Sequence, residues 1–150
     1  MQLPPLSEEG LKELLSQTLV AKIATTSAKG EVRISPVVFG VANGAFLINT
    51  FENSALVKNL RRSPNCSLLI DTTAPYPDGV DPGVGVHYWG TATVEGPEND
   101  VPGMGKLFAR YVGGSEEKAR AYAEKLVGWG KRVYVRFRPE RSVSWDFRQA

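Results

Sequence analysis

The dipeptide Asn43-Gly44 constrains the fold of this 150-residue chain more narrowly than any other feature. It separates two runs rich in β-branched and aromatic residues, 32–41 and 45–50. Asn-Gly in that setting predicts a two-residue hairpin, because both residues tolerate the positive φ that the turn requires. Since residues 20–26 form another such run before a turn at 28–31, the first half of the chain predicts an antiparallel meander.

The remaining segments extend this pattern with further strands and a few helices. Ser7 and Ser54 are placed to cap helices, because a serine hydroxyl accepts a hydrogen bond from a free N–H of the first turn. Further strands are expected at 66–71, 86–95, 133–138 and 142–147, and further helices at 101–112 and 115–127. Pro36 cannot donate to a sheet ladder, so its strand is expected at a bulge or at a sheet edge.

Six to seven antiparallel strands with few helices favour a mainly β fold, a small closed or partly closed barrel. The length leaves room for one domain, expected over residues 1–150. A long loop is expected at residues 72–85, with three prolines and three glycines. Such a loop either covers a site as a lid or is a passive surface loop.

Charge and composition exclude several classes of function. The formal net charge is +2, which is too near neutral to indicate a general nucleic-acid or membrane binder. No stretch reaches the roughly 18 apolar residues of a membrane span, and the start of the chain lacks a signal-peptide pattern. Cys66 is the single cysteine, which is typical of a reducing compartment, so we expect a cytoplasmic protein. His87 is the single histidine, which leaves little support for a histidine zinc site or a Ser-His-Asp hydrolase.

Residues 49–64 carry the most informative chemistry. Thr50 lies at a strand end and Ser54 at a helix start, and the cations Lys58, Arg61 and Arg62 follow on that helix. Free N–H groups and partial positive charge at a helix N-terminus attract anions, so these residues could form a phosphate site. The alternative is a capped surface helix whose basic side chains are solvated.

Taken in order, these segments resemble the pyridoxamine-phosphate-oxidase-like flavin and deazaflavin proteins. The resemblance rests on Ala-Lys-Ile-Ala-Thr-Thr at 21–26, Gly-Glu-Val-Arg-Ile-Ser-Pro-Val at 30–37, Asn-Thr at 49–50, the run from Ser54 to Pro64, Trp-Gly-Thr-Ala at 89–92 and Phe-Arg-Pro-Glu-Arg-Ser-Val-Ser-Trp at 137–145. It covers most of residues 7–147. Each motif is degenerate, and their order along the chain is what is specific.

The resemblance implies a homodimeric split β-barrel that binds FMN, or alternatively coenzyme F420, in a groove shared by both subunits. The residues that it implies for the cofactor are Ile34, Ser35, Pro36 and Val37 beside the flavin ring, Thr50, Ser54 and Lys58 at the phosphate, and Trp89 and Trp145 near the groove. One position departs from the family pattern. Relatives commonly carry Lys or Arg three residues before the Asn59-Leu60 pair, where this chain has Leu56, and Lys58 could substitute for that cation.

The function implied is an oxidoreductase that transfers hydride between the cofactor and a small conjugated organic molecule. No acid–base pair is needed, since the cofactor carries the chemistry. Phe39, Phe51, Tyr88 and Trp89 could shape a substrate slot, or could pack in the core or a dimer interface.

Two alternatives remain open at this point. One is a non-catalytic flavin- or anion-binding split-barrel protein, which Leu56 supports. The other is a small β-barrel that binds single-stranded nucleic acid through Lys58, Arg61, Arg62, Arg136 and Arg138, against which the net charge speaks.

Overall fold

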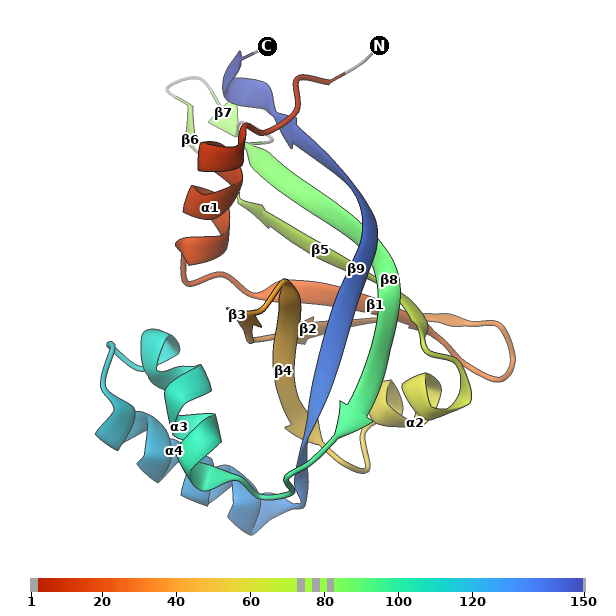
Figure 1. Cartoon of the computed structure of the whole chain (residues 1–150), viewed down its shortest axis with the longest axis vertical. Helices are drawn as coiled ribbons and strands as arrows, with labels where there is room; N and C mark the ends of the chain where they lie inside the picture. The colour runs from red at the N-terminus through yellow and green to blue at the C-terminus, as the bar shows by residue number, and fades with distance from the viewer. Residues whose placement is uncertain (1–2, 73–74, 77–78, 81–82, 150) are drawn as a thin grey trace.

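A seven-stranded antiparallel sheet forms the body of the protein and curls into a half-barrel (Figure 1). The computed structural model describes residues 3–72, 75–76, 79–80 and 83–149. The strand order is β2-β1-β5-β8-β9-β4-β3, so β2 and β3 are the two edges. These edge strands follow each other in the chain, with Val38 between them. The mainly β, antiparallel split-barrel class predicted from the sequence is confirmed.

The elements follow the predicted order closely. The sheet strands are β1 (Ala21–Thr26), β2 (Val32–Val37), β3 (Phe39–Ala42), β4 (Ala45–Phe51), β5 (Asn65–Thr72), β8 (Val84–Glu95) and β9 (Arg132–Asp146). The helices are α1 (Glu8–Ser16), α2 (Ala55–Arg62), α3 (Val101–Phe108) and α4 (Glu116–Trp129), with 3-10 turns η1 (Ala109–Tyr111) and η2 (Phe147–Gln149). Two short strands, β6 (Pro75–Tyr76) and β7 (Gly79–Val80), pair within the expected 72–85 loop. The rest of that loop's tip, residues 73–74, 77–78 and 81–82, lies outside the described residues, so its role as a lid stays a prediction.

The turn and cap signals are confirmed at the positions expected. Asn43 and Gly44 both have positive φ, 52° and 75°, and join β3 to β4. The Ser7 hydroxyl accepts a hydrogen bond from the Gly10 N–H and caps α1. Pro36 lies in β2, an edge strand, where its missing N–H costs no ladder bond on the open side.

Two expectations were wrong. The run 32–41 was expected as one strand of a continuous meander, and the structure divides it at Val38 into β2 and β3. Because β2 pairs with β1 and β3 pairs with β4, the two strands lie at opposite edges of the sheet and the first half forms two separate hairpins.

The segments 133–138 and 142–147 were expected as two strands, and the structure joins them into the single long strand β9. The strand continues through Pro139 because β4 pairs with β9 only as far as Phe137. Beyond that point β8 is the paired neighbour, and its register shifts at Trp89/Gly90, opposite Pro139. A bulge there accommodates the proline.

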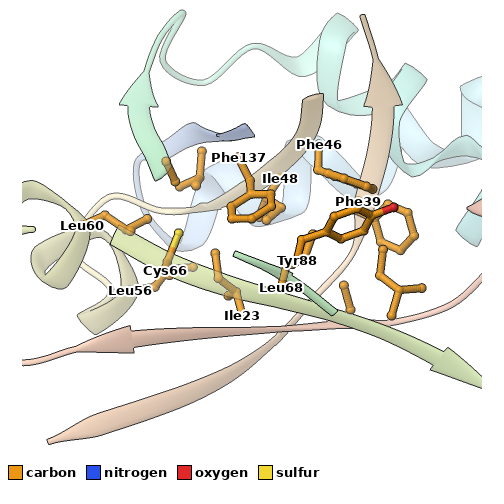
Figure 2. Close-up of a cluster of buried hydrophobic side chains, with 14 of the residues drawn as sticks. Ile23, Phe39, Phe46, Ile48, Leu56, Leu60, Cys66, Leu68, Tyr88 and Phe137 are labelled. Carbon is orange, nitrogen blue, oxygen red and sulfur yellow. The ribbon is translucent and has the colours of Figure 1, made fainter. Parts of the chain in front are cut away.

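Two groups of buried side chains lie on the two faces of the sheet. Inside the curl, Phe39, Phe46, Tyr88 and Phe137 form an aromatic cluster, joined by aliphatic residues from β1, β5 and α2 (Figure 2). Outside β4 and β9, α3 and α4 enclose a second, smaller cluster around Met104. Among the helices in the described part of the chain, none has the length and apolar character to cross a membrane.

Candidate functional site

Helix α2 is held against the barrel by one face and presents the other to solvent. Leu56, Val57 and Leu60 are buried in the core, and Leu56 is only 3% exposed. Figure 2 shows Leu56 and Leu60 beside Cys66, in the cluster of apolar side chains. Because a helix turns by about 100° per residue, Lys58 projects on the side opposite to Leu56 and is exposed.

Polar contacts fix the start and the middle of the same helix. The Ser54 hydroxyl accepts a hydrogen bond from the Val57 N–H at 3.2 Å, as expected of a cap. The buried Asn59 amide donates from Nδ2 to the Thr25 hydroxyl at 3.1 Å and ties α2 to β1. These bonds determine where the exposed face of α2 lies, and therefore where Lys58 can reach.

An open groove of about 600 Å³ separates this face of α2 from the hairpin between β1 and β2. Three cations line it, Lys29 and Arg33 from the hairpin and Lys58 from α2, against the single carboxylate of Glu31. Within the described residues, none of the three cations forms an ion pair. The groove is therefore a positively charged site whose cations are available to an anion.

The predicted cofactor residues reach this region to different extents. Ile34 lines the groove, and Ser35, Pro36 and Val37 follow it along β2. Ser54 immediately precedes Ala55, where the helical side of the groove begins. Thr50 is half-buried in β4, opposite Val133 of β9. The structure thus brings Lys58 and Ile34 into one groove and places the other five positions on the same two elements or at the end of β4.

Trp89 and Trp145 line two shallow recesses on the outer face of the sheet. The recess at Trp89 has a volume of about 440 Å³ and also includes Val32. The recess at Trp145 has a volume of about 390 Å³ and also includes Ile34. Since Val32 and Ile34 line the cationic groove as well, the edge strand β2 connects the groove to both tryptophan recesses.

The Trp89 indole is held between two neighbours on this outer face. The His87 ring lies 3.9 Å away between centroids, and the Arg141 guanidinium lies 4.0 Å from the indole centroid. Partial burial, and then the Arg141 charge, lower the pKa of His87, so its imidazole is neutral near pH 7. The indole of Trp89 therefore contacts one neutral ring and one cation on this face of the sheet.

Two other features bear on nucleophilic or metal chemistry. Burial raises the pKa of the Cys66 thiol to about 12, so this cysteine is protonated at neutral pH and is not an activated nucleophile. Within the residues that the structure describes, no group of three or more His, Cys, Asp or Glu side chains could hold a metal ion.

Sequence reasoning missed Lys29 and Arg33 as site residues. Arg33 lies within the family motif at 30–37 and Lys29 immediately precedes it, but no spacing rule connects a β-hairpin to a helix more than twenty residues further on. Their approach to Lys58 follows from α2 packing under the hairpin, which the Asn59–Thr25 hydrogen bond fixes. Of the residues considered for a substrate slot, Phe39 and Tyr88 lie in the core, and Phe51 lines a separate groove described below.

The sequence profile of pyridoxamine 5'-phosphate oxidase matches residues 7–146, nearly the whole chain. The chain belongs to the pyridoxamine 5'-phosphate oxidase family. The resemblance inferred from the sequence motifs is thereby confirmed. No curated protein sequence matches this member of the family.

Solved structures share the family fold at low sequence identity. Conserved hypothetical protein Rv2991 from Mycobacterium tuberculosis is 23% identical with a TM-score of 0.78, over 99% of this chain and 89% of that chain. An F420 reductase is 18% identical with a TM-score of 0.64, over 87% of this chain and 94% of that chain. The heme storage protein HutZ from Vibrio cholerae is 16% identical with a TM-score of 0.66, over 97% of this chain and 95% of that chain. At these identities the likeness shows the fold of the pyridoxamine 5'-phosphate oxidase family.

Proposed function

We propose that this protein is an oxidoreductase that binds FMN or coenzyme F420 and transfers hydride between it and a small conjugated organic molecule. Residues 1–150 would form one split-barrel domain acting as a cytoplasmic homodimer. The observation that carries the proposal is the groove beside the exposed edge strand β2, where Lys29, Arg33 and Lys58 have no ion-pair partner among the described residues. Membership of a family in which flavin binding is typical supports it.

The residues present fit an anionic cofactor tail. Lys58 and Arg33 would donate charge-assisted hydrogen bonds to the phosphate oxygens of either cofactor, which replaces the cation absent at Leu56. The Ser54 hydroxyl, which accepts from the Val57 N–H, keeps its own proton free to donate.

The heterocycle would lie along β2. Ile34, Ser35, Pro36 and Val37 would flank it, the side chain of Ile34 and backbone groups of the strand holding it flat. When bound, FMN or F420 supplies the hydride chemistry itself. The protein then positions the ring, excludes water from its reactive face and leaves space for a substrate.

A second copy of the chain would complete this site. Val32 and Ile34 are 69% and 67% exposed, which is unusual for β-branched side chains, and they adjoin the recesses of Trp89 and Trp145. Burying this surface against a partner would be favourable at roughly 25 cal/mol per Å² of apolar area. The two tryptophans would then face the cofactor groove of the partner subunit.

Titration with FMN and with F420 tests the proposal. Wild-type protein is expected to bind at least one of them, and Lys58→Ala and Arg33→Ala are each expected to weaken binding by about 0.5–3 kcal/mol, the range for a lost hydrogen bond up to a charge-assisted one. Lys125→Ala, which removes an exposed cation on α4, is the matched control and is expected to leave affinity unchanged. Ser54→Ala is less informative because loss of the helix cap alone costs about 1 kcal/mol of stability.

Three outcomes of this titration separate the candidate functions. The enzyme is supported if the protein binds a cofactor and an electron-poor conjugated acceptor then reoxidises the pre-reduced, bound cofactor faster than it reoxidises the free cofactor. Binding without faster reoxidation supports the non-catalytic flavin- or anion-binding protein. Absence of binding to both cofactors, with unchanged behaviour of the two variants, contradicts the assignment of the groove.

The cations that a nucleic-acid-binding function would require are mostly engaged in contacts within the protein. Four of the five cations that it requires are engaged within the chain: Arg61 with Glu52, Arg62 with the Thr26 carbonyl, Arg136 with Glu95 and Arg138 with the Thr93 hydroxyl. Salt-dependent binding of an oligonucleotide, without affinity for either cofactor, would favour it.

Dimerisation is tested by mass. Wild-type protein is expected to give twice the 16.4 kDa chain mass in light scattering at micromolar concentration. Ile34→Asp is expected to shift the protein to monomer, because it places a charge in the interface without a fixed partner. Val41→Asp, at an exposed valine of the other edge strand, is the control and is expected to stay dimeric. A monomeric wild-type protein would contradict the shared groove.

A further inference from the structure

A second groove, lined almost entirely by aromatic and aliphatic side chains, lies between the α3–α4 helical pair and the end of β4. Its volume is about 580 Å³, within the usual size range of small-molecule sites. Phe51, Phe108, Tyr111, Tyr122 and Trp129 supply its aromatic surface. Trp129 is 70% exposed, which is unusual for the largest apolar side chain and leaves the mouth of the groove open. This groove shares no lining residue with the cationic groove at Lys58.

One charged side chain, Arg132, lines this otherwise apolar groove, and it is only 6% exposed. Its guanidinium lies 4.2 Å from the centroid of the Phe51 ring. Its Nε donates to Asn49 Oδ1 at 2.8 Å, and its Nη2 donates to the Asn49 carbonyl at 3.2 Å. Both acceptors are neutral, so these bonds orient the guanidinium without balancing its charge.

The other donors of Arg132 are left free. Within the described residues, Arg132 forms no ion pair, and its Nη1 has no hydrogen-bond partner. In the same part of the chain, the only fully enclosed side-chain nitrogen or oxygen without a partner is Arg110 Nε. Nη1 of Arg132 is therefore not fully enclosed, and the side chain to which it belongs lines the groove. Burial lowers the pKa of Arg132, as expected of a desolvated cation, and the interaction with Tyr122 in the same groove opposes this shift only in part.

The strand does not need this charge for its own position. The backbone of Arg132 is anchored separately, its N–H donating to Asn99 Oδ1 at 2.9 Å and its carbonyl accepting from the Asn99 N–H at 3.0 Å. Burying a cation without an anionic partner lowers the stability of the fold. A well-packed apolar side chain at position 132 would fill the same space at least as favourably. The missing counter-charge points to a ligand.

We infer that this groove binds a small monocarboxylate with a flat aromatic or aliphatic body. One uncompensated positive charge matches one negative charge, and the free edge of the guanidinium at Nη1 presents N–H groups of the geometry that carboxylates accept. The apolar body would lie along Phe51, Tyr122 and Trp129, where its burial is favourable. The inference is independent of cofactor binding, because the two grooves are separate.

Calorimetric titration of the full chain with 2-naphthoate and with 2-naphthylmethanol at pH 7.5 tests it. The two probes share the ring system and differ in charge. Naphthoate is expected to bind saturably and at least tenfold more tightly than the neutral alcohol. Equal affinities, or no saturable binding of naphthoate, would overturn the inference without recourse to any variant.

Substitution of the arginine locates the effect. Arg132→Met is expected to weaken naphthoate binding by about 10- to 100-fold, the loss for a charge-assisted contact, and to change binding of the alcohol by less than threefold. Arg132→Lys retains the charge and is expected to retain part of the discrimination. Arg120→Met, at an exposed arginine on α4, is the matched control. If Arg132→Met keeps its thermal transition and still binds naphthoate as the wild type does, the assignment to Arg132 is wrong.

Discussion

Leu56→Lys is expected to destabilise the protein by about 3–5 kcal/mol, although it introduces the basic residue that the resemblance to the family implies at this position. The Leu56 side chain is packed among Leu60, Cys66 and other core residues (Figure 2), where a lysine ammonium would have no counter-ion. The loss is a large part of the 5–15 kcal/mol by which domains are typically stable. Denaturant unfolding followed by tryptophan fluorescence measures it.

Leu56→Met is the control for this experiment. It conserves volume and apolar character and is expected to cost less than about 1.5 kcal/mol. A stable Leu56→Lys protein that binds FMN or F420 more tightly than the wild type would show instead that position 56 reaches the cationic groove. That result would contradict the separation of Leu56 from Lys58 on opposite sides of α2.

Gly90→Ala is expected to cost about 3 kcal/mol or more, the upper end of the effect of overpacking a buried site. A methyl group at Gly90 would collide with the Arg138 carbonyl oxygen and lie 3.1 Å from the Pro139 Cα. Both are backbone atoms of β9 at the bulge, so neither can rotate away as a side chain would. Thermal unfolding of the variant measures the loss.

Gly128→Ala provides the matched comparison. Gly128 lies in α4, where an added methyl group would meet no described atom within 4 Å apart from its chain neighbours and the backbone of its own helix, and alanine favours the helix by up to about 1 kcal/mol. The same substitution is thus expected to have opposite signs at the two positions. Equal stability of Gly90→Ala and wild type would mean that β8 and β9 can separate at the bulge at little cost.

Local signals in the sequence predicted most of the fold. Asn43-Gly44 placed one hairpin, and Ser7 and Ser54 each cap the helix that follows them. Such signals depend on interactions within a few residues, so the rest of the fold does not alter them. The error at Pro139 was different in kind, because a proline interrupts a strand only where a neighbour requires its N–H. Strand neighbours are a property of the whole sheet.

The candidate site was predictable only where its residues lie close together in the sequence. The helix cap and the cations of 49–64 lie within one segment, and the sequence motif indicated Lys58 and Ile34. Arg33 and Lys29 approach Lys58 only once the hairpin packs over α2. The Arg132 groove could not be predicted from the sequence. Its lining residues come from separate elements, β4, α3, η1, α4 and the start of β9, which only the fold brings together.

The central place of β9 in the sheet has a consequence for how the chain reaches its folded state. β9 lies between β8 and β4, so that without it the sheet falls into two parts, β2-β1-β5-β8 and β4-β3. Among the described strands β9 is also the last in chain order, and its contact with β4 joins residues far apart in the chain. The two parts can therefore join into one sheet only through β9, so completion of the half-barrel depends on contacts between residues that are distant in the sequence.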